Sequence, residues 1–542
     1  MVDQLTKQFQ FEGYETSFTG TPYINYLLNI KSQAIKQEIF PILFALCFLL
    51  SFLIIGELRG AILVFVPSLF AAASTLFLSK LMFQEMNMIT SIIPVLNFIL
   101  NLTLGYHIYC TYIKERSITK VFTRKLAPIL LMISTTAIGF GSLYFSHIEA
   151  IRQMSLTSSI GLILTCIIHM LWSWLTYDTI NQKKALTLSS KGEKLVLKVT
   201  RLMNPKIIFS SGLIMGLIGI FMANKIQVMT EAAHYFQDHS HIKEKMERIH
   251  NERIGNPNFE ILINYGGEEQ DFEHLKKIWD WETELTKLIP QHKILSMNQF
   301  VAEANYLYSG DKKIPDQAMA YALLRGGIDP ELSQSFMNES IYRLTLTGPF
   351  LGNAQYLDLE KKIENFLIDN KIPAQIGGLY YTLRKSQNSL IWILVQSFSL
   401  SLLIILILAF VHFRSFSILM SFTLANIIPA MTALLLMYVT GLTLNVATVM
   451  TFSITIGIIV DGSFHIAHAI SKNESETELL RESLIPIFMS SAILILSFLV
   501  LGLYDFLPIR HFGLTLALNI TLGLIFDLKV LPWLMRRKHK VA

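Results

Sequence analysis

Long apolar stretches constrain this chain more than any other feature. About eleven of them approach or exceed the roughly 20 mostly apolar residues that a membrane-spanning helix needs. Backbone N–H and C=O groups must find partners inside a bilayer, so runs of this length predict helices. The chain is therefore predicted to be a polytopic α-helical membrane protein. The predicted spans cover residues 39–55, 61–81, 86–113, 126–145, 151–177, 207–223, 389–411, 415–440, 444–470, 484–503 and 512–535.

Composition excludes several other classes of protein. The 542 residues are 52% hydrophobic and only 16% charged, and the net charge of +5 does not indicate a nucleic-acid partner. The three cysteines, Cys47, Cys110 and Cys166, lie in apolar stretches, which argues against a disulfide framework or a thiolate metal site. The sequence contains neither a phosphate-binding glycine loop nor a Ser-His-Asp arrangement. We therefore expect no cofactor, no metal and no enzymatic activity.

A polar region of domain size interrupts the apolar spans between residues 224 and 387. Alternating apolar residues predict strands at Asn258–Tyr265 and Tyr342–Thr347, and helical periodicity predicts amphipathic helices at Asp271–Leu288 and Leu357–Asp369. The residues between, about 296–340, are expected to be helical or irregular. Two strand–helix pairs predict an α+β unit of ferredoxin-like type. Its aromatic residues, Tyr308 among them, are expected in its core.

Short basic segments predict the orientation in the membrane. Lys and Arg concentrate in Lys114–Lys125, in Asp178–Lys206 and in the tail that begins at Arg536, so these segments are predicted to be cytoplasmic. The Leu195–Leu202 part of the second segment is a candidate amphipathic helix on the membrane surface. Alternation of the spans then predicts a cytoplasmic C-terminus and an extracytoplasmic region 224–387. Residues 1–38 are predicted to be outside as well.

The two halves of the chain resemble each other at a single offset. Glycine, asparagine, proline and histidine residues recur at numbers that differ by 358, as His107 and His465 do, and the two Ile-Arg pairs at 151 and 509 follow the same rule. Further matches are Gly20 with Gly378, Asn87 with Asn445, and Pro128 with Pro486. Two copies in one orientation predict parallel repeats related by an axis along the membrane normal.

This repeat predicts five parts of the chain. Residues 39–205 form a first five-helix repeat with a cytoplasmic linker, and residues 206–223 form a linking helix. Residues 224–387 form an extracytoplasmic domain, and residues 388–542 form the second repeat. Residues 1–38 are interpreted as the end of a first such domain. A symmetric molecule would then extend about 150 residues further toward the N-terminus.

The span from Asn445 to Ile470 carries titratable residues inside apolar sequence. Asp461 and His465 share one helix face with Ser453 and Gly457, because all four follow at four-residue steps. A carboxylate deep in hydrocarbon costs at least ~2.5–3.5 kcal/mol, and such residues usually serve ion or proton pathways. The alternative interpretation is a polar contact near the cytoplasmic end of the helix.

Three segments resemble the resistance–nodulation–division (RND) transporters, in particular the MMPL-like and hopanoid-exporter branch. Gly457–Ile466 (GIIVDGSFHI) resembles the G-x-x-x-D-x-x-x-H signature of a central helix. Ser134–Ser142 (STTAIGFGS) is similar to the following helix, and Asp527–Pro532 (DLKVLP) to the end of the last one. The resemblance covers nearly the whole chain. It implies twelve helices, two external porter domains and export driven by proton entry between the two central helices.

The resemblance also implies roles for individual residues. Asp461 would take the proton, and His465, His107, Ser490 and Ser491 would support it. The first-repeat position that often holds an aspartate in the family is Thr103, which cannot carry a charge. The alternative for the histidines is packed polar residues, and for the serines it is contacts that join neighbouring helices. Asp527 is expected near the cytoplasmic end, paired with Lys529.

Together these features predict proton-coupled export of a hydrophobic or lipid-like molecule across the bacterial inner membrane. The expected partners are that molecule, protons and the membrane, with a homo-oligomer, a periplasmic partner or a chain supplying the N-terminal part as further candidates. Two alternatives stay open. One is a lipid-sensing scaffold that does not transport, favoured by Thr103, and the other is an inactive fragment of a longer permease.

Overall fold

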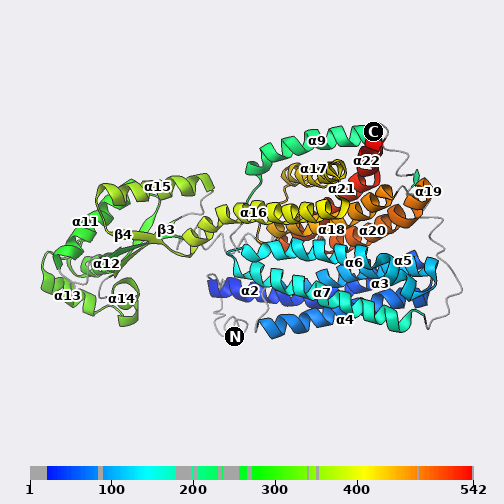
Figure 1. Ribbon diagram of the computed structural model, residues 1–542. Coiled ribbons are helices and arrows are strands. Elements are labelled where there is room, and N and C mark those ends of the chain that lie inside the picture. Colours follow the sequence, from blue (N-terminus) through cyan, green and yellow to red (C-terminus); the bar gives the residue numbers. More distant parts are fainter. Residues whose placement is uncertain are drawn as a thin grey trace. The chain divides into compact units, whose positions relative to one another are not determined.

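A computed structural model gives the arrangement of most of the chain (Figure 1). It describes residues 21–83, 89–178, 197–198, 204–229, 235, 256–264, 272–338, 341–348, 353–472 and 475–539. The chain divides into two compact units, and each is described by itself. The helical unit comprises Asn25–Met229 and Ser389–Ala542, and the smaller α+β unit comprises Thr230–Asn388 together with Met1–Ile24.

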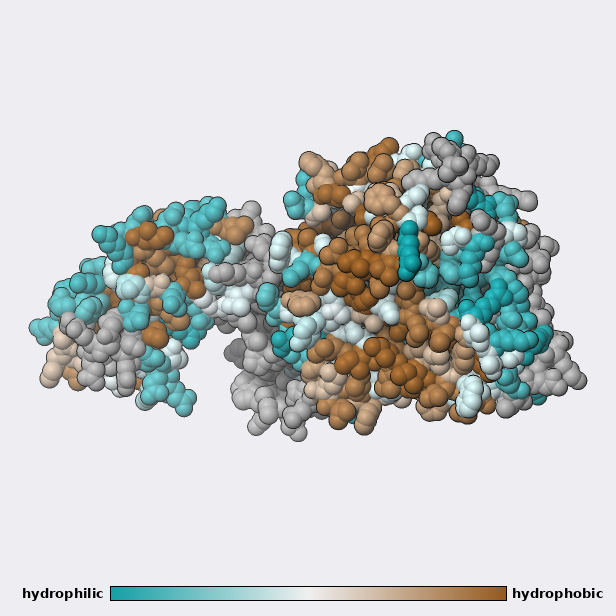
Figure 2. All heavy atoms as spheres, viewed as in Figure 1, coloured by the Kyte–Doolittle hydropathy of each residue, from teal (hydrophilic) through white to brown (hydrophobic). Residues whose placement is uncertain are grey.

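The described residues contain 11 helical segments long and apolar enough to cross a membrane, which confirms the predicted number of spans. Apolar side chains dominate the flank of the helical unit that Figure 2 shows, as a lipid-facing surface requires. The protein is a multi-pass membrane protein. Its principal helices are α3 (Phe40–Ile55), α4 (Leu58–Met82), α5 (Ile93–Glu115), α6 (Ile118–Gly141), α7 (Glu149–Thr176), α9 (Pro205–Met222), α16 (Leu379–Phe413), α17 (Phe416–Thr440), α18 (Thr448–Ser471), α20 (Ile485–Leu501) and α21 (Leu507–Ile525).

Helix bounds follow the 358-residue offset of the sequence repeat. Helix α4 and helix α17 begin and end at equivalent residues, Leu58 with Phe416 and Met82 with Thr440. Within an apolar stretch of 18 residues from each span, burial is highest for the spans of α5 and α18, at 94% and 89% of the residues, against 17% for the span of α9. Helices α5 and α18 therefore occupy the interior of the bundle, one from each repeat.

Two glycines let the repeats approach closely at α6 and α18. A side chain added at Gly139 of α6 would lie 2.6 Å from the carbonyl oxygen of Ser453, and one added at Gly457 would lie 2.8 Å from that of Thr135. The Thr136 hydroxyl lies 3.3 Å from the Gly457 carbonyl oxygen, to which it can donate across the same contact. Small residues commonly bring membrane helices together in this way. Gly457 thus packs on α6, and this contact fixes the rotation of α18 and the direction in which Asp461 points.

The α+β unit contains a four-stranded antiparallel sheet with the order β2-β3-β1-β4. Strands β1 (Asn256–Asn264) and β3 (Ile341–Gly348) and helices α11 (Phe272–Leu288) and α15 (Asn353–Asp369) confirm the predicted elements. The order and the two strand–helix pairs confirm the ferredoxin-like topology. Strands β2 (Lys293–Leu295) and β4 (Ala374–Gly377) are too short to give a sequence pattern.

Residues 296–340 contain three helices, which agrees with the helical or irregular expectation: α12 (Met297–Ser309), α13 (Ala318–Gly326) and α14 (Pro330–Phe336). The expectation that Tyr308 lies in the core is wrong, because its residue is 85% exposed at the end of α12. Helix α12 turns Met297 and Val301 toward the core instead. Tyr308 follows Val301 by seven residues and lies on a similar side of α12, but in its last turn, beyond the buried residues of this helix.

Several predictions concern residues outside the described part of the chain. Of the predicted remnant at residues 1–38, the structure describes helix α2 (Thr21–Ala34), which continues through a π-helical turn into α3. Of the candidate surface helix Leu195–Leu202 it describes residues 197–198 alone. Asn87, one of the repeat matches, also lies outside the described residues.

Candidate functional site

Asp461 lies on α18 in the interior of the helical unit, with its side chain 16% exposed. His465, one turn further along the same helix, places Nε2 at 3.5 Å from Asp461 Oδ1. His107 of α5 approaches from the other repeat, with Nε2 at 4.0 Å from Oδ2. The two imidazole rings stack with centroids 5.2 Å apart and planes inclined by 11°. One carboxyl group thus faces two histidines that come from different repeats.

The two histidines occupy equivalent positions in the sequence repeat, and the structure brings them face to face. A second equivalent pair meets in the same way, because Arg124 Nη2 donates to Glu482 Oε2 at 2.8 Å across the 358-residue offset. Residues that meet their own equivalents lie on the axis that relates two repeats. Asp461 therefore lies beside this axis, where a movement of one repeat against the other changes its surroundings first.

A cavity inside the bundle brings most of the predicted residues together. Asp461, His107, Ser490 and Ser491 line it, and Thr103, Thr136 and Thr165 add further hydroxyl groups. The Ser490 hydroxyl donates to the Ile487 carbonyl at 3.1 Å within its own helix. Ser490 therefore presents its oxygen to the cavity while its proton is engaged elsewhere.

His465 lies beside this cavity and lines two others. One of them is lined by Lys114, Arg124, Lys125 and Glu482 together with His107. The other is lined by Asp461, His412, His468 and Lys472 among its polar groups. A continuous set of polar groups thus leads from Asp461 toward the end of α5 that carries Lys114.

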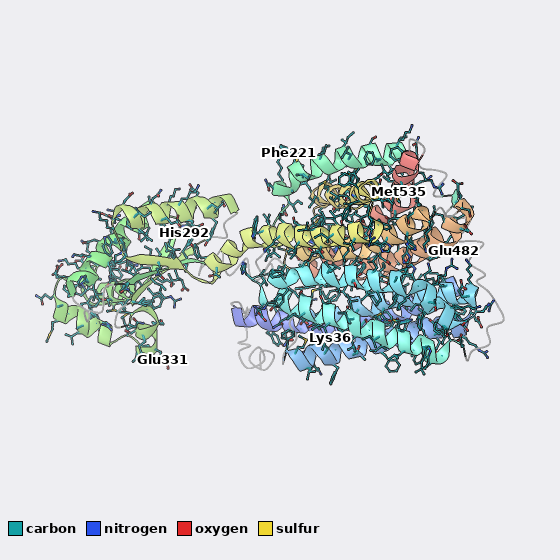
Figure 3. All side chains as sticks on the ribbon, viewed as in Figure 1. Lys36, Phe221, His292, Glu331, Glu482 and Met535 are labelled. Carbon is teal, nitrogen blue, oxygen red and sulfur yellow. The ribbon has the colours of Figure 1, made fainter. Side chains whose placement is uncertain are left out.

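Ion pairs join the two repeats at that end of the bundle, where Figure 3 labels Glu482. Glu482 pairs with Lys114 and with Arg124, and Arg124 also pairs with Glu115 at 2.7 Å. Lys114 and Arg124 are about half exposed, so each pair is worth only ~0–1 kcal/mol. Their effect is to hold α5, α6 and the segment before α20 in one register.

Asp527 also lines the cavity, and its expected pairing with Lys529 is wrong. The residue is 2% exposed, and its Oδ1 accepts a hydrogen bond from the Ser463 hydroxyl of α18. Asn426 of α17 donates to the same serine at 3.0 Å. Asp527 follows the buried residues Ile520 and Gly523 of α21 by seven and four residues, so it shares their helix face and points inward. The 358-residue offset makes Asp527 the equivalent of His169 in the first repeat, and this equivalence was the sequence signal for Asp527.

Thr103 occupies the position equivalent to Asp461 and lines the same cavity. Its hydroxyl donates to the Leu100 carbonyl at 2.7 Å, one turn back on α5. The carboxyl groups that line the cavity among the described residues, Asp461 and Asp527, therefore both come from the second repeat. Within the same described residues, no cluster of three or more histidine, cysteine, aspartate or glutamate side chains is arranged to hold a metal ion.

The fold of this chain is similar to that of solved membrane-protein structures. No family model matches the sequence, and no curated protein matches it. Among solved structures, the hedgehog release protein Disp of the water bear Hypsibius dujardini is similar over 94% of this chain and 71% of its own, with a TM-score of 0.64 and 12% identity. The chain therefore shares its overall fold with this structure.

A second solved structure with a similar fold is SecDF of Thermus thermophilus, a translocon-associated membrane protein. It is similar over 95% of this chain and 63% of its own, with a TM-score of 0.53 and 12% identity. Both identities are low, so the likeness concerns the fold alone.

Proposed function

We propose that the protein is a permease of RND type that couples proton movement through Asp461 to the export of a hydrophobic or lipid-like molecule. The observation that carries the proposal is the position of Asp461 between His107 and His465 beside the axis of the two repeats. A proton crossing a potential of 100 mV releases ~2.3 kcal/mol, enough to bias a two-state rearrangement of similar free energy. Protonation of Asp461 removes the charge that the two imidazoles face.

The orientation proposed from the basic segments gives the path its direction. With the Lys114–Glu482 end in the cytoplasm, the two cavities beside His465 lead protons from Asp461 into the cell. The α+β unit then lies outside the inner membrane. The lipid-like nature of the cargo rests on the resemblance to the MMPL-like branch, whose signature Gly457–Ile466 carries.

One observation favours a second function, a lipid-sensing scaffold without transport. Thr103 leaves the first repeat without a carboxyl group at the position of Asp461, and its hydroxyl is engaged with its own helix. The proposed transport function therefore assigns the coupling to Asp461 of the second repeat. The two functions differ in one measurable property, which is proton flux that depends on Asp461.

The experiment uses the full chain in proteoliposomes that contain a pH-sensitive dye and Nile red as the apolar probe. We expect an imposed proton gradient to drive proton uptake and redistribution of the probe, and Asp461→Asn to abolish both. The matched control is Asp316→Asn at an exposed position of the α+β unit, which should keep both activities. Proton and probe movement that survive in Asp461→Asn would show that this carboxyl group is not the coupling site.

A further inference from the structure

Buried polar groups also fill the contact between α4, α5 and α7, on the face of α5 that is turned toward these two helices. Asn97, Asn101 and Gly105 follow at four-residue steps on α5, and Thr157, Gly161, Thr165 and His169 do so on α7. Asn97 Nδ2 donates to Thr75 Oγ1 of α4 at 3.1 Å. Asn101 Nδ2 donates to the Thr165 carbonyl at 2.8 Å. Together with the buried residues Ser79 of α4 and Ser158 of α7, these groups form one column along three helices, which we name the first-repeat column.

Several atoms of the first-repeat column are fully buried and have no protein partner. A buried polar atom without a partner costs about 1–3 kcal/mol, so native structures satisfy it with water or with a ligand. The atoms concerned are the side-chain oxygens of Ser79, Asn97, Thr157 and Ser158 and the Nε2 nitrogen of His169. Four of these five residues lie toward the end of the bundle where α4 ends and α5 and α7 begin.

The hydrogen bonds around His169 define its protonation. Because the Asn101 amide nitrogen donates to Thr165, the Asn101 oxygen faces His169 Nδ1 at 2.6 Å and accepts its proton. Nε2 is therefore the bare nitrogen, an acceptor in a residue with 0% exposure. Its position depends on Gly105, where an added side chain would lie 2.7 Å from Nε2 and 2.3 Å from Cε1. The Asn101 amide, which accepts the hydrogen bond from the ring, carries no charge.

The column joins the cavity of Asp461. Asn101 and Thr165, which hold the His169 end of the column, also line that cavity. In the second repeat, the positions equivalent to Thr75, Ser79 and Asn101 hold the apolar residues Ala433, Met437 and Ile459. The positions equivalent to Asn97, Thr157 and His169 hold Thr455, Thr515 and Asp527, so the polar lining is more extensive in the first repeat and contains a histidine only there.

We propose that the first-repeat column is a hydrated proton path from the extracytoplasmic side to Asp461, with His169 as its titratable station. The proposal rests on the proposed function, because it supplies the protons that Asp461 uses. In each step His169 Nε2 accepts a proton from a water of the column and later returns it to a water nearer the cavity. The Nδ1 proton stays on its bond to Asn101, no covalent bond between heavy atoms forms, and charge is conserved.

The test compares proton uptake of full-length variants in the same proteoliposomes. His169→Gln is expected to lower gradient-driven uptake at least tenfold, because the amide cannot bind and release a proton at the place of Nε2. Gly105→Ala, which displaces the ring, is expected to act in the same direction. His147→Gln, at an exposed position before α7, is the matched control and should keep the uptake of the unchanged protein. Uptake in His169→Gln equal to that of the control would overturn the proposal.

A second measurement does not depend on whether the His169→Gln variant folds correctly. Ser79 and Thr157 are replaced singly by cysteine in a chain whose three native cysteines are replaced by serine or alanine, and Ag⁺ is added on the extracytoplasmic side. We expect both cysteines to react, while cysteine at Ile167, a lipid-facing position of α7 with 50% exposure, should not. Protection of both column positions would overturn the proposal.

The outcomes separate this proposal from the proposed function. If Asp461→Asn abolishes uptake while His169→Gln retains it and the column cysteines do not react, protons reach Asp461 by another route and the transport function stands. If the unchanged protein shows no gradient-driven uptake, both proposals fail.

Discussion

Glu282 in the α+β unit gives the most quantitative prediction. Its residue on α11 is 0% exposed, and its carboxyl group accepts hydrogen bonds from Gln299 Nε2 at 3.0 Å and from the Tyr342 hydroxyl at 3.3 Å. Burial raises the pKa of this group from 4.5 to about 7, against the opposing effect of hydrogen bonds from Ser296, Gln299 and Tyr342. The folded unit therefore keeps a proton over a range in which the unfolded chain has lost it.

The sign and size of the effect follow from this difference in pKa. Below the unfolded pKa both states are protonated and the group costs nothing. As the pH rises, the unfolded chain ionises first, so the stability of the folded unit falls until the pH passes the folded pKa of about 7. Each pKa unit corresponds to about 1.4 kcal/mol, so Glu282 lowers the stability by about 3 kcal/mol between pH 4.5 and pH 8.

Hydrogen exchange on the full-length protein measures this prediction. After correction for the intrinsic pH dependence of exchange, the protection of the core amides of α11 and β3 should fall about 100-fold from pH 4.5 to pH 8. Glu282→Gln should flatten this slope, and Glu284→Gln, at an exposed position of the same helix, should leave it unchanged. A slope in Glu282→Gln as steep as in the control would refute the reasoning.

Two further predictions concern the contacts between the repeats. Gly457→Ala would bring a methyl group to 2.8 Å from the Thr135 carbonyl oxygen. We expect this change to lower the stability of the purified protein by about 1–3 kcal/mol, as measured by thermal unfolding. An unchanged unfolding midpoint would contradict this packing. Glu482→Gln removes the charged partner of the half-exposed Lys114 and Arg124, so the stability measured in the same way should fall by less than about 1 kcal/mol. A larger loss would contradict the exposed position of these ion pairs.

The sequence was sufficient for the architecture because its signals are long. A helix that spans a membrane needs an apolar run of about 20 residues, and such runs identified every span, including the interior helix α18. The strands β1 and β3 also carry enough alternating residues to be found. Strands β2 and β4, with 3 and 4 residues, form because β3 and β1 offer them hydrogen-bonding edges, and this information is not local.

The candidate site was predicted less completely. The resemblance implied that His107 lies near Asp461, and the structure places its Nε2 atom 4.0 Å from Asp461 Oδ2. The partner of Asp527 was predicted wrongly, because the Ser463 hydroxyl that bonds to it lies on another helix, and a contact between helices leaves no local signal in the sequence. His169 was missed because a single histidine in an apolar span carries no signal until its partners on α4 and α5 are known.

The meeting of equivalent residues at the axis also bears on how such a molecule assembles. If two first repeats paired with each other, Arg124 would face a second Arg124, and two second repeats would set Glu482 against Glu482. The observed pair is opposite in charge, so it favours one repeat of each kind in every molecule. His107 and His465 still form the like-with-like contact that a symmetric dimer would have. The bundle thus retains the geometry of a homodimer, while its charges favour the pairing of one repeat with the other rather than with a copy of itself.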